Sequence, residues 1–211
     1  MLVKVCGITS LEDSLAALDA GADALGFNFY ARSPRYLTPE NARAIIKQLP
    51  EDLLTVGVFV NEDLEVIRKI ATTAGVRALQ LHGDESPEYC ETLKDYYLIK
   101  AFAGGPEFNP ERLRDYHVDA IMIDAVDPDG VGGGTGRLSD WLVAAKTSEL
   151  FPKVFLAGGL SAENVGEAIR AVKPYAVDAC SRLESAPGRK DHERVRAFVA
   201  AVRNATDPER T

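Results

Sequence analysis

The sequence predicts a single (β/α)8 barrel, an α/β fold in which eight parallel strands alternate with helices. Three observations predict it: eight short apolar runs, a helical apolar period between them, and no break in composition along 211 residues. Nearly continuous apolar runs are typical of parallel strands that are buried on both faces. A doubly wound open sheet is the competing architecture, and the count of eight favours the closed barrel.

The strands and helices are expected to alternate along the whole chain. The expected strands are residues 2–6, 22–28, 54–60, 76–82, 96–102, 118–124, 153–159 and 176–180. The expected helices are residues 10–21, 38–49, 62–75, 86–96, 109–116, 139–150, 161–172 and 190–204. Residues 1–203 are therefore interpreted as one barrel domain, and the polar residues 204–211 are expected to fray.

Several of the expected helices carry residues that are typical of helix ends. Serine or threonine at the first position accepts hydrogen bonds from free backbone N–H groups, and a proline directly after it fits the first helical turn. Glycine after the last helical residue adopts the left-handed conformation that ends a helix. The start signals are Ser10, Thr38, Ser86 and Ser161, and the stop signals are Gly21 and Gly75.

Composition and charge exclude several classes of protein. The formal net charge is -8 and no cluster of Lys and Arg overrides it, so a nucleic-acid partner is not expected. No run of 18 apolar residues predicts a membrane span, and no secretory signal is visible, so a cytoplasmic location is expected. Cys6, Cys90 and Cys180 match neither a disulfide framework nor the spacing of a zinc site.

The ends of the seventh and eighth strands predict a phosphate site. In a (β/α)8 barrel the functional site lies at the carboxyl ends of the strands, and phosphate is held after the last two of them. Gly158 and Gly159 lead into a helix, so bare backbone N–H groups can approach a ligand there. The segment 180–188, with Ser181, is long enough for a short extra helix. A tight turn without a ligand is the alternative interpretation of the glycine pair.

Cys6 and Asp124 are candidates for acid–base chemistry around that phosphate. Strands six, seven, eight and one are neighbours in a closed barrel, so Asp124 and Cys6 would flank a ligand held between them. A thiol and a carboxyl group placed in this way can transfer protons. Each residue also has a structural alternative, since a thiol at a strand end is often inert and an aspartate there often caps a loop. His82, at the same rim, fits a structural role as well as a ligand contact.

The sequence resembles a known family in a series of motifs that occur in the same order along the chain. These are KVCGIT, GADALGFNFY, RSPRY, VGVFVN, LQLHG, IKAF, GGGTG, LAGGLSAENV and a closing Pro-Gly-x-Lys-Asp, between residue 3 and about residue 200. Together they resemble phosphoribosylanthranilate isomerase. The resemblance implies a (β/α)8 barrel of tryptophan biosynthesis that carries out an Amadori rearrangement without metal or organic cofactor. Its substrate is a small phosphorylated molecule, and the expected assembly is a monomer or homodimer.

The resemblance also implies roles for individual residues. Cys6 corresponds to the general base and Asp124 to the general acid, so residues 1–203 form the catalytic domain. Arg35 would hold the anthranilate carboxylate, because a guanidinium forms two parallel hydrogen bonds with it. Asp178 corresponds to an aspartate that contacts the substrate. The glycine-rich segment 131–136 is interpreted as a loop that closes over the site.

The segment after the eighth strand departs from the family pattern. Cys180 stands where the family has serine, and Arg182 stands where it has glycine. A thiol is a weak hydrogen-bond donor, whereas an arginine adds positive charge. Our hypothesis is that Arg182 points at the phosphate.

Two other functions remain open from the sequence. A histidine-pathway aminoaldose phosphate isomerase of the same fold uses an aspartate where this chain has Cys6, and it shows a clearer twofold repeat with a second phosphate site. A barrel that binds a phosphorylated metabolite without turnover is the second alternative. The presence of both Cys6 and Asp124 counts against that alternative.

Overall fold

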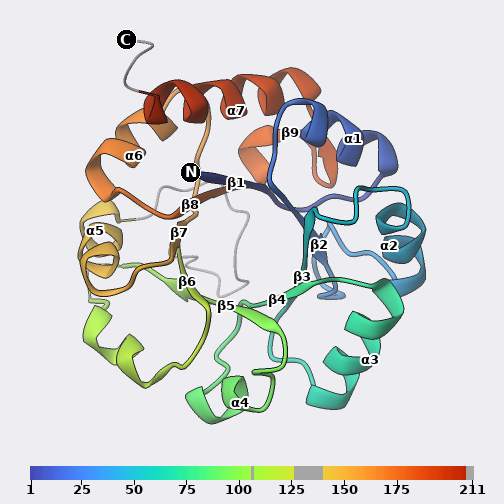
Figure 1. Cartoon of the computed structure of the whole chain (residues 1–211), viewed down its shortest axis with the longest axis horizontal. Helices are drawn as coiled ribbons and strands as arrows, with labels where there is room; N and C mark the ends of the chain where they lie inside the picture. Colours follow the sequence, from blue (N-terminus) through green and yellow to red (C-terminus); the bar gives the residue numbers. More distant parts are fainter. Residues whose placement is uncertain (106, 126–139, 208–211) are drawn as a thin grey trace.

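The computed structural model describes residues 1–105, 107–125 and 140–207, and in them eight parallel strands close into a barrel (Figure 1). The first strand pairs with both the second and the eighth, which closes the sheet. This arrangement confirms the predicted barrel over the open sheet. The strands are β1 (Leu2–Val5), β2 (Ala24–Asn28), β3 (Leu54–Phe59), β4 (Ala78–Leu81), β5 (Tyr97–Ala103), β6 (Ala120–Asp124), β7 (Val154–Leu156) and β8 (Ala176–Ala179).

Helices surround the barrel and cover the outer face of the strands (Figure 1). The α-helices are α1 (Leu11–Asp19), α2 (Pro39–Ile46), α3 (Leu64–Ala74), α4 (Pro87–Glu91), α5 (Trp141–Leu150), α6 (Val165–Val172) and α7 (His192–Thr206). Two 3-10 helices, η1 (Pro110–Asp115) and η2 (Ser181–Leu183), and a two-stranded ribbon, β9 (Glu184–Ala186) and β10 (Arg189–Lys190), complete the described elements. The short helix η2 lies in the segment where an extra helix was predicted.

Three of the predicted helix starts and one predicted helix stop are confirmed by the hydrogen bonds and backbone angles at these positions. Ser10, Thr38 and Ser86 each accept a backbone hydrogen bond at the start of α1, α2 and α4. Gly75 follows α3 with a φ of 78°, in the left-handed region that favours glycine.

Several helical segments differ from the prediction. Helix α4 ends at Glu91, five residues before the expected end at Tyr96. The fifth expected helix is only the 3-10 helix η1. Helix α6 begins at Val165 rather than near Ser161, because the Asn164 side chain closes a turn by accepting from the Ser161 N–H and donating to the Gly159 carbonyl. Helix α7 continues to Thr206, three residues beyond the expected end of the barrel domain.

Alternation along the strands decides which side chains face the barrel interior. One apolar cluster contains alternate residues of the strands, among them Ala78, Met122 and Ala176, and it fills the inside of the barrel. The residues between them belong to a second, larger cluster that packs against the helices. Continuing the inward alternation to the end of each strand places Cys6, His82, Asp124 and Cys180 at the carboxyl-end mouth of the barrel.

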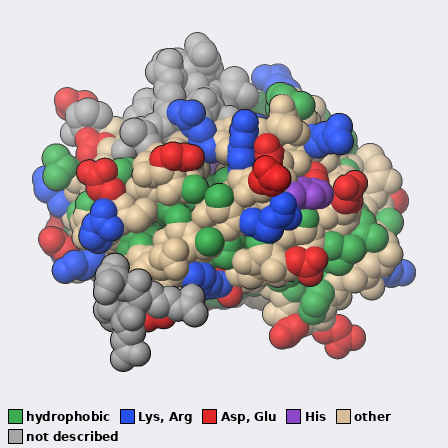
Figure 2. Space-filling model, turned by 90° about the horizontal axis from the view of Figure 1, so that it is seen from above, with side chains coloured by type: hydrophobic (Ala, Val, Ile, Leu, Met, Phe, Trp, Pro, Cys, Tyr) green, Lys and Arg blue, Asp and Glu red, His purple; other side chains and the backbone are tan. Residues whose placement is uncertain are grey.

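The surface of the molecule is mixed in charge. On the face viewed in Figure 2, acidic and basic side chains are interspersed among smaller hydrophobic areas. Within the part of the chain that the structure describes, none of the helices has the length and hydrophobicity needed to span a bilayer.

Candidate active site

A buried ion pair lies directly below the mouth of the barrel. In the register of β1 and β8, Lys4 stands opposite Asp178, and the Lys4 Nζ is 2.7 Å from Asp178 Oδ1. Lys4 is completely buried. Burial opposes its charge, but Asp178 and Cys6 together outweigh this effect and raise the Lys4 pKa. Lys4 is therefore a permanent cation inside the barrel.

Cys6 lies one step above this lysine and next to Cys180. Val5 of β1 pairs with Ala179 of β8, and the two cysteines are the next residues on these neighbouring strands. The Cys6 N–H donates to the Ala179 carbonyl at 2.9 Å. A hydrogen bond from the Cys180 thiol lowers the pKa of Cys6, burial opposes this effect, and the charges of Lys4 and Lys190 lower the pKa further. Cys6 is accordingly the thiol of the pair that ionises first.

The thiol of Cys180 has the opposite tendency. Its hydrogen bond with Cys6 and its burial raise its pKa. Lys190 approaches Cys180 from the other side, with its Nζ 3.2 Å from the carbonyl oxygen and 3.9 Å from Sγ. Cys180 Sγ also lies 4.0 Å from Glu184 Oε1. A neutral Cys180 is thus available as a donor beside an ionised Cys6.

Gly26 leaves the space that Cys6 and Lys4 occupy. A Cβ at this position would lie 2.7 Å from Cys6 Sγ and 3.2 Å from Lys4 Nζ. Since a Cβ does not approach a sulfur atom that closely, any larger residue at position 26 would displace the Cys6 thiol or the Lys4 side chain. The small residue therefore protects the geometry of the site.

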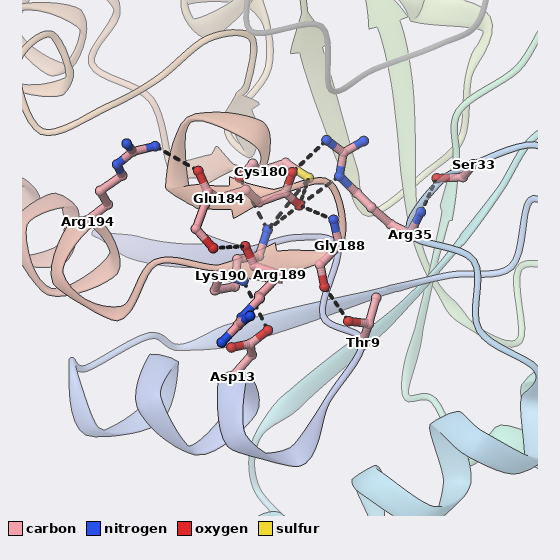
Figure 3. Close-up of polar contacts among 11 residues, drawn as sticks. Thr9, Asp13, Ser33, Arg35, Cys180, Glu184, Gly188, Arg189, Lys190 and Arg194 are labelled. Carbon is pink, nitrogen blue, oxygen red and sulfur yellow. Dashed lines mark hydrogen bonds and ion pairs between the residues drawn. The ribbon is translucent and has the colours of Figure 1, made fainter.

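Arg35 is placed beside the mouth by a bidentate ion pair (Figure 3). Its Nε and Nη2 each donate to one oxygen of Glu184 at 2.8 Å, and Lys190 Nζ lies 3.0 Å from Glu184 Oε1. Burial favours neutral Glu184, but the hydrogen bonds from Arg35 and the charge of Lys190 lower its pKa. Arg35 is thus tied to the segment after β8.

Glu184 and Lys190 were not predicted as site residues from the sequence. Both lie on the ribbon of β9 and β10, which was not predicted. Pro187 and Gly188, the latter with a φ of 78°, form the turn of this ribbon. A proline followed by glycine between two short segments is a turn signal, so the ribbon could have been found.

Asp124 ends β6 with a polar neighbour at each carboxyl oxygen. Oδ1 accepts from the backbone N–H of Ala125 at 2.7 Å, and Oδ2 lies 3.2 Å from Nε2 of His82. The residue is buried. His82 is therefore the side chain in contact with the predicted acid.

Asp178 connects the two sides of the site electrostatically. Burial raises its pKa to about 6, Lys4 lowers it, and the charges of Cys6 and Asp124 both raise it. In the order of the strands around the barrel, the strand of Asp178, β8, lies between β1, which precedes Cys6, and β7, whose other neighbour β6 ends in Asp124.

Gly158 and Gly159 follow β7 in the left-handed conformation, with φ values of 89° and 61°. A Cβ at Gly158 would lie 2.7 Å from the backbone nitrogen of Ala125, so glycine is required there. Ser181 and the exposed Arg182 lie in η2, and Arg182 is one of several groups that lower the pKa of Glu163, after a hydrogen bond from Ser161.

Two further sequence predictions concern features beyond these contacts. The segment 131–136, interpreted as a loop over the site, lies outside the described residues. No cluster of three or more His, Cys, Asp or Glu residues suited to a metal ion occurs in the parts of the chain that the structure describes.

The fold and the site define a (β/α)8-barrel enzyme whose ionisable side chains gather at the carboxyl ends of the strands. The model of one family, N-(5'-phosphoribosyl)anthranilate isomerase, matches residues 3–201. The chain belongs to this family, which confirms the resemblance seen in the sequence. The members of the family are isomerases that convert an aldose to a ketose by an Amadori rearrangement in tryptophan biosynthesis.

Three relatives show how close the similarity is. N-(5'-phosphoribosyl)anthranilate isomerase of Pelobacter propionicus is 48% identical over 93% of this chain and 93% of its own length. A structure of monomers made from the dimeric Thermotoga maritima isomerase has a TM-score of 0.86, 38% identity, and covers 97% of this chain and 100% of its own. An isomerase in complex with reduced 1-(o-carboxyphenylamino)-1-deoxyribulose 5-phosphate has a TM-score of 0.86, 39% identity and the same coverage.

Proposed function

We propose that this chain isomerises N-(5'-phosphoribosyl)anthranilate to 1-(2-carboxyphenylamino)-1-deoxyribulose 5-phosphate, with Cys6 as general base and Asp124 as general acid. Membership of the family supports the reaction. The observation that supports the two roles is the presence of a thiol of lowered pKa and a buried carboxyl group, both of which raise the pKa of Asp178.

The proposed reaction uses one proton transfer on each side of the sugar. Asp124 gives its proton to the ribose ring oxygen, the bond between this oxygen and C1 breaks, and a protonated Schiff base forms between C1 and the anthranilate nitrogen. The Cys6 thiolate then removes the proton from C2, and the electron pair neutralises the Schiff base to an enamine. This enol tautomerises to the ketone. Proton transfers of this kind each contribute on the order of 10²–10⁴-fold to the rate.

The charges around Cys6 support its role as a base. A thiolate is costly to bury without a partner, and here Lys4 and Lys190 supply positive charge from two strands. Both lysines are themselves buried and tied to a carboxylate, Lys4 to Asp178 and Lys190 to Glu184. The cations are therefore held in place when Cys6 gains the C2 proton.

Two groups of residues are proposed to hold the negatively charged ends of the substrate. Backbone N–H groups at Gly158 and Gly159, together with Ser181 and Arg182, would hold the phosphate. If Arg182 points at the phosphate, replacing it by glycine raises the KM several-fold. An unchanged or lower KM would contradict this role.

Arg35 is proposed to bind the anthranilate carboxylate. Glu184 occupies Nε and Nη2 of its guanidinium, so we infer that Nη1 makes the contact. The bidentate pair with Glu184 then acts to orient the arginine. Asp178 is proposed to contact the ribose hydroxyl groups from the wall between the acid and the base.

The expected partner is this small phosphorylated substrate, and the expected assembly is a monomer or a homodimer. The Thermotoga maritima relative is described as dimeric and has been obtained as monomers. All three cysteines are free, which fits the reducing cytoplasm proposed as the compartment.

Turnover of N-(5'-phosphoribosyl)anthranilate by the purified protein tests the reaction and the roles together. The parent, Cys6→Ser, Asp124→Asn and the double variant are compared in vitro and in a strain that lacks this isomerase. We expect the parent alone to rescue growth. Rescue by the double variant would contradict the roles. Turnover of the histidine-pathway aminoaldose phosphate instead, or binding without turnover in a single-turnover assay, would contradict the reaction.

A further inference from the structure

His82 connects a side chain inside the barrel to the carboxyl group of Asp124. Gln80 and His82 occupy successive inward positions at the end of β4. Gln80 Nε2 lies 2.7 Å from His82 Nδ1, and His82 Nε2 lies 3.2 Å from Asp124 Oδ2. The side chains of His82 and Asp124 are only 13% and 10% exposed, so water has little access to this contact.

The contact with Gln80 decides which ring nitrogen of His82 carries the proton. The amide nitrogen of Gln80 can only donate a hydrogen bond, so Nδ1 must accept it. The proton of the neutral ring is then on Nε2, the nitrogen that lies 3.2 Å from Asp124 Oδ2. In this form the histidine is able to donate to the carboxyl group that we propose as the general acid.

This donation complements the backbone bond at the other oxygen of Asp124. The Ala125 N–H donates to Oδ1, and His82 Nε2 lies 3.2 Å from Oδ2. Donors at both oxygens would restrict the rotation of the carboxyl group. They also stabilise its anion, which forms when the proton leaves for the ribose ring oxygen.

Resting on the proposed function, we propose that His82, held in its Nε2–H form by Gln80, is the positioning residue of Asp124. It orients the acid toward the sugar and stabilises the carboxylate after proton transfer. The Gln80 side chain serves this purpose at a cost: its buried Oε1 has no hydrogen-bond partner among the described residues. An amide whose donor end alone is used fits a role in directing the histidine tautomer.

Two substitutions of His82 separate this role from a merely structural one. Glutamine keeps an N–H donor near the place of Nε2, whereas asparagine keeps one near the place of Nδ1 and is too short to reach Asp124. We expect His82→Asn to lower kcat by about tenfold or more with KM within about twofold, because ground-state binding is not involved. His82→Gln should keep kcat within about threefold of the parent. Equal losses in the two variants, or an unchanged kcat in His82→Asn, would overturn the proposal.

The tautomer is measured independently of activity. The chain has three histidines, so ¹⁵N-labelled imidazole signals are few and His82 is assigned by the signal that disappears in His82→Gln. We expect the Nε2–H form in the parent and its loss in Gln80→Met, with no change at His192, which bonds to Asp13. An Nδ1–H form in the parent would overturn the positioning role alone, whereas an active Asp124→Asn would instead overturn the role proposed for the acid.

Discussion

Replacing Cys180 by alanine removes the thiol that donates a hydrogen bond to Cys6 and leaves both neighbouring lysines in place. The hydrogen bond is the largest of the effects that lower the pKa of Cys6. A hydrogen bond to a charged group contributes about 1.5–3 kcal/mol, and a thiol is a weak donor, so the lower end applies. Because one pKa unit corresponds to about 1.4 kcal/mol, the pKa of Cys6 should rise by about one unit in Cys180→Ala.

The pH dependence of alkylation by iodoacetamide measures this change, since only the thiolate reacts. Mass spectrometry of the peptide that contains Cys6 separates its reaction from that of Cys90, whose pKa burial raises to about 11. Cys180→Ser is the matched control because its hydroxyl group keeps a donor in place. We expect the midpoint for Cys6 to rise by about one pH unit in Cys180→Ala but not in Cys180→Ser. Coinciding midpoints in the parent and Cys180→Ala, or equal shifts in both variants, would refute the reasoning.

Three further predictions concern stability. Glu184→Gln leaves Arg35 and Lys190 without their carboxylate and should lower the free energy of unfolding in urea by about 3–5 kcal/mol; a loss below about 1 kcal/mol would contradict the ion-pair account. Gly158→Ala adds a Cβ beside Ala125 in a left-handed conformation and should cost about 1–3 kcal/mol, seen as a lower Tm. The control Gly166→Ala, inside α6 where the nearest atoms to a Cβ lie at 3.6 Å and 3.8 Å, should not lower it. Equal Tm values for these two variants would refute that steric argument. The pKa of Asp178 is raised from 3.8 to about 6 by burial, so the native state keeps a proton that the unfolded chain has lost. This group's contribution to stability is therefore full below pH 3.8 and is lost as the pH rises through about 6. Urea titrations across this range should show that fall in the parent but not in Asp178→Asn, and equal slopes would contradict it.

The barrel could be predicted because its information is local and repeated. Each strand is an apolar run, each helix has its own period, and signals such as Ser10 or Gly75 need no distant partner. The error at α6 is instructive in this respect. Ser161 is a good first residue of a helix, but the Asn164 side chain bonds back to the Ser161 N–H and the Gly159 carbonyl, and α6 begins only after it. Competing caps separated by three residues are decided by backbone geometry, which the residue types alone do not specify.

The residues of the site could be predicted only where their position at the end of a strand was enough to identify them. Cys6, Asp124 and Asp178 follow from the rule that barrel sites lie at the carboxyl ends of strands. The charges that favour a Cys6 thiolate do not follow, because Lys190 is 184 residues away along the sequence and reaches Cys6 only through the β9–β10 ribbon. The groups that lower the pKa of Cys6 are Cys180 and the two lysines. Contacts between segments that lie far apart in the sequence, such as that of Lys190 with the Cys6 region, become visible only in the folded chain.

The central claim is that Cys6 removes the proton from C2 after Asp124 has opened the ring. A single-turnover measurement with substrate deuterated at C2 of the ribose tests it most directly. In Cys6→Ser, proton removal should become fully rate-limiting, so the rate should fall strongly and the deuterium isotope effect should exceed that of the parent. A Cys6→Ser variant that turns over at the parental rate, or a slow one without an isotope effect, would contradict the account.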